Sequence, residues 1–192
     1  RPAAEVAAPR GGYIVPAAHA AWAARRLAVH EIEFRALDAG VPAQAVQVFR
    51  ATKTEFAPKP FEGHTRLTVT GDWAGETRAI PAGSLFVPIA QPKALLVMAL
   101  FEPQAPDSYL SWGFFNAHFE AKEYMDAYVA EAVGREMLAK DAVVAAEFER
   151  RLATDPEFAK DPKARLEFFH RKHPSWDERL NLYPVFRVNV EP

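Results

Sequence analysis

The sequence contains no cysteine, which excludes disulfide bonds, thiolate metal sites and a cysteine nucleophile. It also has no apolar run near the roughly 18 residues that a membrane-spanning helix needs, since the longest such run covers only residues 94–101. Neither sign of charge dominates, because 23 Lys and Arg residues stand against 25 Asp and Glu residues, giving a net charge of −2. Nucleic-acid binding needs a basic stripe, so neither a nucleic-acid partner nor a membrane span is predicted.

Catalytic motifs are missing as well. The sequence has no His-Glu-x-x-His zinc motif, no Gly-x-Ser-x-Gly elbow and no glycine-rich phosphate loop. His30 and Glu33 have His-x-x-Glu spacing, but so short a motif recurs by chance and its neighbours are charged or bulky. His170 and His173 lie one helical turn apart, and we expect them at a solvent-facing helix end. We therefore predict no metal ligand and no catalytic residue in this chain.

The composition is that of a globular protein, with 49% hydrophobic and 12% aromatic residues. Residues 1–12 are rich in Ala, Pro and Gly and predict a linker, and we expect this start to be the interior of a longer protein. Residues 13–119 predict a sheet domain, residues 120–182 a helical subdomain, and residues 183–190 a last strand that returns to the sheet.

The first forty residues predict a strand, a helix and a second strand. A short apolar run at 13–16 precedes an Ala-rich helix at 17–29, and hydrophobic residues alternate over 31–37. Such a crossover is what joins two parallel strands. Alternating stretches between 45 and 90 then predict mainly antiparallel strands. The expected fold class is therefore α+β, with a mainly antiparallel or mixed sheet and a helical insert before the last strand.

Helix signals dominate the later part of the chain. Proline at position 92 precedes a short predicted helix at 93–101. Residues 120–173 are strongly helical in pattern, and Asp141 is expected to cap one of the helices. Asp155 and Asp161 each precede a proline, the arrangement of a capping acid before the first helical residue, so two further helices are predicted to begin there.

An aromatic cluster at 111–115 supplies the candidate binding residues. We consider that the side chains around it line a pocket: His64, Gln91, Trp112, Asn116 and His118. The alternative is that this cluster packs in the core with hydrogen-bonded edges, as aromatic runs commonly do.

Several short segments of the sequence also resemble a known family. They are Tyr13-Ile14-Val15-Pro16, Pro60-Phe61-Glu62-Gly63-His64, Pro81 to Pro88, Ala90-Gln91-Pro92, Leu100-Phe101-Glu102-Pro103, Ser111 to Phe115 and Tyr183 to Arg187. In this order they resemble the region that follows the catalytic domain in large bacterial proteins of the carboxypeptidase A-like zinc metallopeptidase family. The resemblance runs from about Gly12 to Val188.

This resemblance implies an accessory C-terminal domain whose parent protein hydrolyses peptide bonds. Zinc is then expected on the missing N-terminal catalytic domain, which is also the expected partner, and no cofactor is expected in this chain. The implied roles are packing on the catalytic domain, shaping substrate access or forming a homo-oligomer. Such parents are commonly exported, which implies the periplasm or the outside of the cell.

Two other functions stay open at this point. One is an independent peptide- or ligand-binding module around Trp112. The other is an enzyme with unrecognised chemistry, which would gather His64, His118 and carboxylates with shifted pKa values in a cleft.

Overall fold

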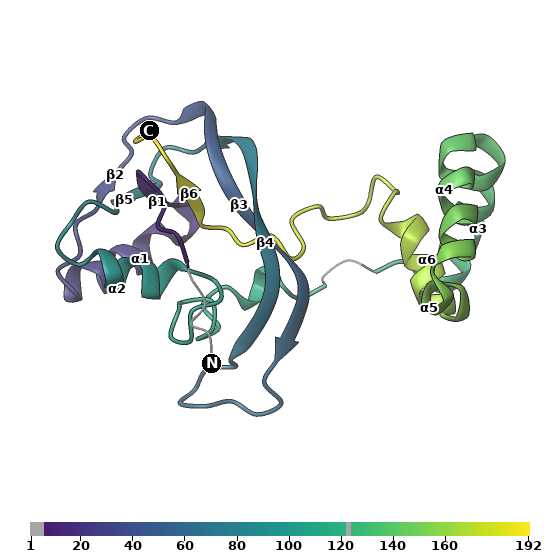
Figure 1. Cartoon of the computed structure of the whole chain (residues 1–192), viewed down its shortest axis with the longest axis horizontal. Helices are drawn as coiled ribbons and strands as arrows, with labels where there is room; N and C mark the ends of the chain where they lie inside the picture. The colour runs from purple at the N-terminus through teal and green to yellow at the C-terminus, as the bar shows by residue number, and fades with distance from the viewer. Residues whose placement is uncertain (1–5, 122–123) are drawn as a thin grey trace. The chain divides into compact units, whose positions relative to one another are not determined.

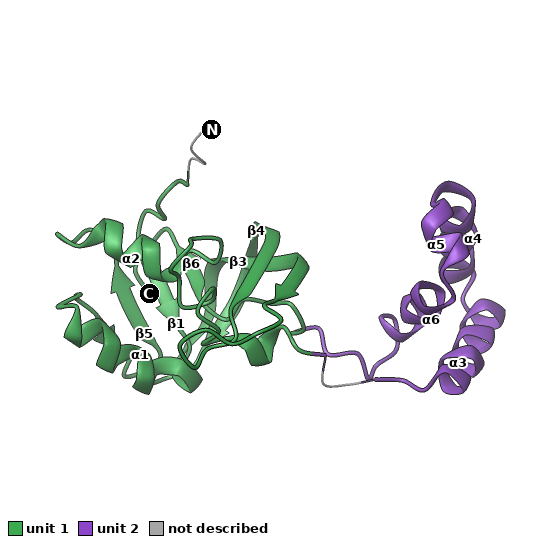
Figure 2. Ribbon diagram, turned by 90° about the horizontal axis from the view of Figure 1, so that it is seen from below, with its two compact units in different colours: residues 1–120, 179–192 green, residues 121–178 purple. Residues whose placement is uncertain are grey.

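The computed structural model describes residues 6–121 and 124–192, and the chain forms two compact units (Figure 2). Unit 1 comprises Arg1–Glu120 and Arg179–Pro192, and unit 2 comprises Ala121–Glu178. The predicted α+β class is confirmed, because unit 1 begins with a strand and a helix and contains an antiparallel six-stranded sheet. None of the helices described is both long and apolar enough to cross a membrane.

The elements follow the chain in a simple order (Figure 1). Unit 1 contains β1 (Gly12–Val15), α1 (Ala17–Val29), β2 (Arg35–Ala36), β3 (Val41–Phe56), β4 (Leu67–Ile80), β5 (Leu85–Pro88), α2 (Ala94–Phe101), the 3-10 helix η1 (Asn116–His118) and β6 (Phe186–Val188). Unit 2 contains α3 (Ala127–Lys140), α4 (Ala142–Thr154), α5 (Pro156–Lys160) and α6 (Pro162–His170). The strand order in the sheet is β2-β5-β1-β6-β3-β4.

The parallel strand pair expected at the start of the chain is not formed. β1 lies between β5 and β6 and is antiparallel to both, while the strand predicted over 31–37 is reduced to β2, which pairs with β5. The reason is local, because the N–H of Ile32 donates to the carbonyl of Leu27 at 2.9 Å. The backbone at this point therefore closes the end of α1 instead of extending a ladder of strand hydrogen bonds.

The predicted linker ends earlier than its composition indicates. Gly11 donates to the carbonyl of Val188 at 2.9 Å, and Gly12 is the first residue of β1. Gly12 has φ of 149°, and a Cβ there would lie 2.1 Å from the carbonyl oxygen of Val87, so only glycine fits this close approach. Residues 1–5 of the predicted linker lie outside the described residues.

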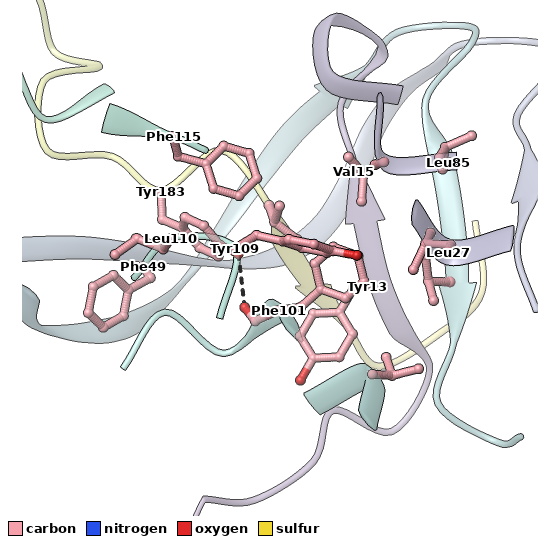
Figure 3. Close-up of a cluster of buried hydrophobic side chains, with 14 of the residues drawn as sticks. Tyr13, Val15, Leu27, Phe49, Leu85, Phe101, Tyr109, Leu110, Phe115 and Tyr183 are labelled. Atoms are coloured by element: carbon pink, nitrogen blue, oxygen red, sulfur yellow. Dashed lines mark hydrogen bonds between the residues drawn. The ribbon is translucent and has the colours of Figure 1, made fainter. Parts of the chain in front are cut away.

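The sheet has a hydrophobic cluster on each face. Tyr13 and Val15 of β1 belong to the larger cluster, which includes residues of α1, α2 and β5, whereas Ile14 belongs to the smaller one. This alternation is the period-two pattern of a strand buried on both faces. Figure 3 shows the larger cluster, in which the hydroxyl of Tyr183 donates to the carbonyl of Phe101 at 3.0 Å.

A buried ion pair is built into this core. Arg187 of β6 donates to both carboxylate oxygens of Glu102, which follows α2, and the Tyr13 hydroxyl donates to the same carboxylate. The Arg187 guanidinium also lies over the Trp73 ring, 4.3 Å from its centroid. Burial, reinforced by the Glu102 charge, raises the pKa of Tyr13 well above its ordinary value. The sheet and α2 are thus joined by charged groups away from water.

The helix starts in unit 2 follow the predicted caps. The Asp141 carboxylate accepts from the N–H groups of residues 143 and 144, and Asp155 and Asp161 accept from residues 158 and 163. Each acid therefore satisfies N–H groups that a helix start leaves unpaired, and the three predictions are confirmed. The helical pattern expected from residue 120 begins as a helix only at α3, and residues 122–123 lie outside the described residues.

Phenylalanine rings form the core of unit 2. Phe158, Phe168 and Phe169 are buried, and Phe148 packs against all three. The ring of Phe169 lies directly on α3, because a Cβ at Gly134 would be 2.7 Å from its Cδ2 atom. The unit therefore depends on a few large aromatic contacts.

Candidate functional site

A tight turn places two aromatic side chains beside each other at the surface of unit 1. Phe61 and His64 exchange two backbone hydrogen bonds of 2.9 Å. The residues between them, Glu62 and Gly63, have φ of 49° and 78°, as the central residues of a type I′ turn do. The turn thus sets the Phe61 and His64 side chains at its two ends.

The aromatic segment 111–116 is held against the residues after this turn. The N–H of Leu67 donates to the carbonyl of Ser111 at 3.1 Å, and the Asn116 amide donates to the carbonyl of Thr65 at 2.8 Å. Gly113 has φ of 81°, and a Cβ there would lie 2.4 Å from the Thr65 oxygen. Glycine at this position therefore permits the close approach that brings Trp112 to the turn.

The result is a half-exposed surface that we call the Trp112 face, formed by Phe61, His64, Arg66 and Trp112. The Trp112 ring contacts the His64 ring edge-on at 5.7 Å and the Phe61 ring at 6.0 Å. The Arg66 guanidinium lies over the Trp112 ring, 4.5 Å from its centroid. Phe61 is 54% exposed, so the face presents apolar rings and an arginine, which is paired with Asp107 at 4.0 Å.

Phe114 connects this face to a hollow beside α1. Its ring contacts His64 at 5.2 Å on one side and is stacked with Trp22 at 5.0 Å, and the Arg26 guanidinium lies 4.3 Å from its centroid. The hollow, which we call the α1 pocket, has a volume of about 420 Å³. Its lining residues are Trp22, Arg25, Arg26, Val29, His30 and Phe114.

A pair of histidines joins α1 to η1. The Nε2 atoms of His19 and His118 are 3.0 Å apart, and the Trp22 indole N–H donates to Nδ1 of His19 at 3.4 Å. Because an indole nitrogen only donates, we assign the His19 proton to Nε2, from which it is donated to His118. A metal ion on Nε2 of His19 would need the opposite tautomer, so the pair fits a hydrogen bond and not a chelate.

The pair should make the stability of unit 1 depend on pH. Burial lowers the pKa of His19 below its ordinary value of 6.5, so the folded state binds fewer protons than the unfolded state. The stabilisation is complete above about pH 6.5 and is lost as the pH falls through the folded-state pKa. We expect the melting temperature of unit 1 to fall between pH 7 and pH 5 in the wild type, and to fall less in a His19→Gln variant.

The matched control is His30→Gln, which changes an exposed histidine at the end of the same helix. It should keep the wild-type pH profile. If the melting temperatures of the wild type and of His19→Gln fell equally with pH, His19 would not contribute to the pH dependence of stability.

The five predicted binding residues are only partly brought together. His64 and Trp112 touch, Asn116 bonds to Thr65 beside them, and His118 is paired with His19. Gln91 is engaged elsewhere, where its side chain bonds to the main chain of residues 33 and 88. The structure therefore does not bring all five residues together in one pocket.

The two histidine patterns of the sequence also differ in their surroundings. His30 ends α1 and lines the α1 pocket, whereas the N–H of Glu33 donates to Gln91. The solvent-facing position predicted for His170 is wrong, because Trp176 turns back onto its ring at 5.1 Å and leaves it 8% exposed. Within residues 6–121 and 124–192, no group of three or more His, Asp or Glu side chains is placed to hold a metal ion.

Sequence reasoning missed the contribution of α1 to this region. His19, Trp22 and Arg26 are spaced i, i+3 and i+7, which puts them on one helix face. That spacing is the signal that could have identified them, although it does not say which segment the face meets.

Comparisons with protein-family models, with curated proteins and with solved structures found no match to this chain.

Proposed function

We propose that this chain is an accessory domain of a carboxypeptidase A-like zinc metallopeptidase, exported with it, and that the Trp112 face is its docking surface. The observation behind this proposal is the composition of that face, in which Phe61, Trp112 and Arg66 stand together at the surface. Aromatic residues and arginine are enriched at the centre of protein interfaces, where they contribute most of the binding free energy.

The positions of the segments that resemble the metallopeptidase family support the proposal. Residues 13–16 include most of β1, and residues 81–88 include all of β5. These two segments therefore form neighbouring inner strands of the sheet. Residues 60–64 and 111–115 contribute Phe61, His64 and Trp112 to the Trp112 face. A shared sequence at these positions favours both a shared framework and a shared contact surface, while zinc and the hydrolytic step belong to the catalytic domain of the parent.

The proposed occupant of the Trp112 face is the catalytic domain of the same polypeptide, with a second copy of this chain as the alternative outcome. The coding region upstream of Arg1 should encode a zinc domain with a His-x-x-Glu motif. Expressed separately, that domain should bind this chain in isothermal titration calorimetry. A Trp112→Ala substitution should weaken the binding at least tenfold, because a central tryptophan is a typical hot spot.

The matched control is Tyr128→Ala, which removes an aromatic ring that is 73% exposed in unit 2 and should leave the affinity unchanged. Sedimentation that shows self-association weakened by Trp112→Ala would replace the catalytic domain with a second copy as the occupant. Stoichiometric zinc and peptide cleavage by this chain alone would refute the accessory role.

A further inference from the structure

We infer that the α1 pocket binds an organic carboxylate whose body is a planar aromatic ring. This ligand site goes beyond the accessory role proposed above and does not depend on it, because the pocket is formed by residues outside the Trp112 face.

The size and the apolar wall of the pocket suit an aromatic ring. Its volume of about 420 Å³ lies in the range of small-molecule sites, about 300–1,000 Å³. Trp22 and Phe114 are stacked face to face with an interplanar angle of 19°, and this stack forms the aromatic wall of the pocket. Val29, which is 81% exposed, lines the pocket about two helical turns after Trp22 on α1. A planar ring can pack against this wall as the two side chains pack against each other.

The positive charge of the pocket comes from two neighbouring arginines. Arg25 and Arg26 both line the pocket, and neither forms an ion pair with a carboxylate of the residues that the structure describes. The acid that follows His30 in the chain is already neutralised, since Glu31 pairs with Lys93 at 3.0 Å. The pocket therefore presents uncompensated positive charge to a ligand, and guanidinium groups bind carboxylates through charge-assisted hydrogen bonds.

Next to the aromatic wall, but outside the lining of the pocket, lies a buried tyrosine hydroxyl. Tyr109 is only 5% exposed and packs edge-on against both Trp22 and Phe114, at 5.2 and 5.6 Å. Its hydroxyl has no hydrogen-bond partner among the described residues. Burial raises the pKa of Tyr109 to about 12, and the Arg26 charge opposes this rise. The hydroxyl thus stays protonated near neutral pH, as a donor from which no described residue accepts a hydrogen bond.

The test is isothermal titration calorimetry on the full chain at pH 7 with two probes that differ in charge alone. N-acetyl-phenylalanine carries the carboxylate, and its amide, N-acetyl-phenylalaninamide, does not. We expect the acid to bind at least tenfold more tightly than the amide. The double variant Arg25→Gln with Arg26→Gln should lose at least tenfold in affinity for the acid and leave the amide unaffected.

Arg135→Gln is the matched control, because Arg135 is an exposed arginine on a helix of unit 2, and it should bind the acid as the wild type does. Circular dichroism of each variant checks the fold. Equal affinity for acid and amide, an arginine double variant that binds as the wild type does, tighter binding of phenyl phosphate, or no binding of the acid would each overturn the inference. None of these outcomes bears on the Trp112→Ala measurement.

Discussion

Replacing Glu102 with alanine should destabilise unit 1 by about 3–5 kcal/mol, the usual cost of removing one partner of a buried ion pair. The carboxylate accepts from both Arg187 and Tyr13. Its removal leaves a guanidinium in a side chain only 9% exposed without a counter-charge, and a buried hydroxyl without its acceptor. Urea unfolding followed by near-ultraviolet circular dichroism measures the loss.

Two comparisons separate the ion pair from a general effect of mutation. Glu191→Ala removes a partner of the exposed pair with Arg35, in which Glu191 is 61% exposed, and should cost less than about 1 kcal/mol. The double variant Glu102→Leu with Arg187→Met should recover part of the loss, because no charge is then left buried. A loss below about 1 kcal/mol for Glu102→Ala would show that water reaches this pair.

The second large effect is expected in unit 2, where Phe169→Ala should remove a large part of the free energy of unfolding. Replacing a buried phenylalanine with alanine costs about 3–5 kcal/mol. A unit that spans only Ala121–Glu178 has a total stability of about 3–9 kcal/mol, at roughly 0.05–0.15 kcal/mol per residue. The Phe169 ring contacts Phe148 at 4.8 Å and covers Gly134, so its loss removes contacts of α6 with both α3 and α4.

Amide hydrogen exchange gives this measurement for each helix. Protection should fall across α3, α4, α5 and α6, while the strands of unit 1 keep theirs, because the two clusters of unit 1 contain residues of that unit alone among those described. Val143→Ala, at a side chain that is 77% exposed, should change the stability by less than about 0.5 kcal/mol. Full protection of α6 in Phe169→Ala would contradict this prediction, because it would mean that the remaining phenylalanine rings are enough to keep unit 2 folded.

The Trp112 face and the α1 pocket place two kinds of binding surface on unit 1. The face offers aromatic rings and Arg66 for a protein partner, and the pocket offers an aromatic wall with two arginines for a small anion. Phe114 of the pocket contacts Trp22 and also His64 of the face, so the two surfaces are neighbours.

The sequence by itself determined the elements whose causes are local. The predicted helix at 17–29 coincides with α1, and the aspartates before Pro156 and Pro162 cap α5 and α6, because helix propensity and capping act within a few residues. The α+β class followed from the same local patterns. The alternation at 31–37, by contrast, did not produce a full strand, since the end of α1 used its backbone groups.

Only the tertiary structure decided which segments meet. It placed β1 between β5 and β6, left Gln91 apart from Trp112, and brought His19 of α1 to His118, nearly a hundred residues later in the chain. Contacts of this kind depend on how whole faces of helices and sheets bury one another, and a side-chain pattern shows which face is apolar without showing its partner. The α1 pocket, formed by one helix and a single ring from a distant loop, is a product of that packing.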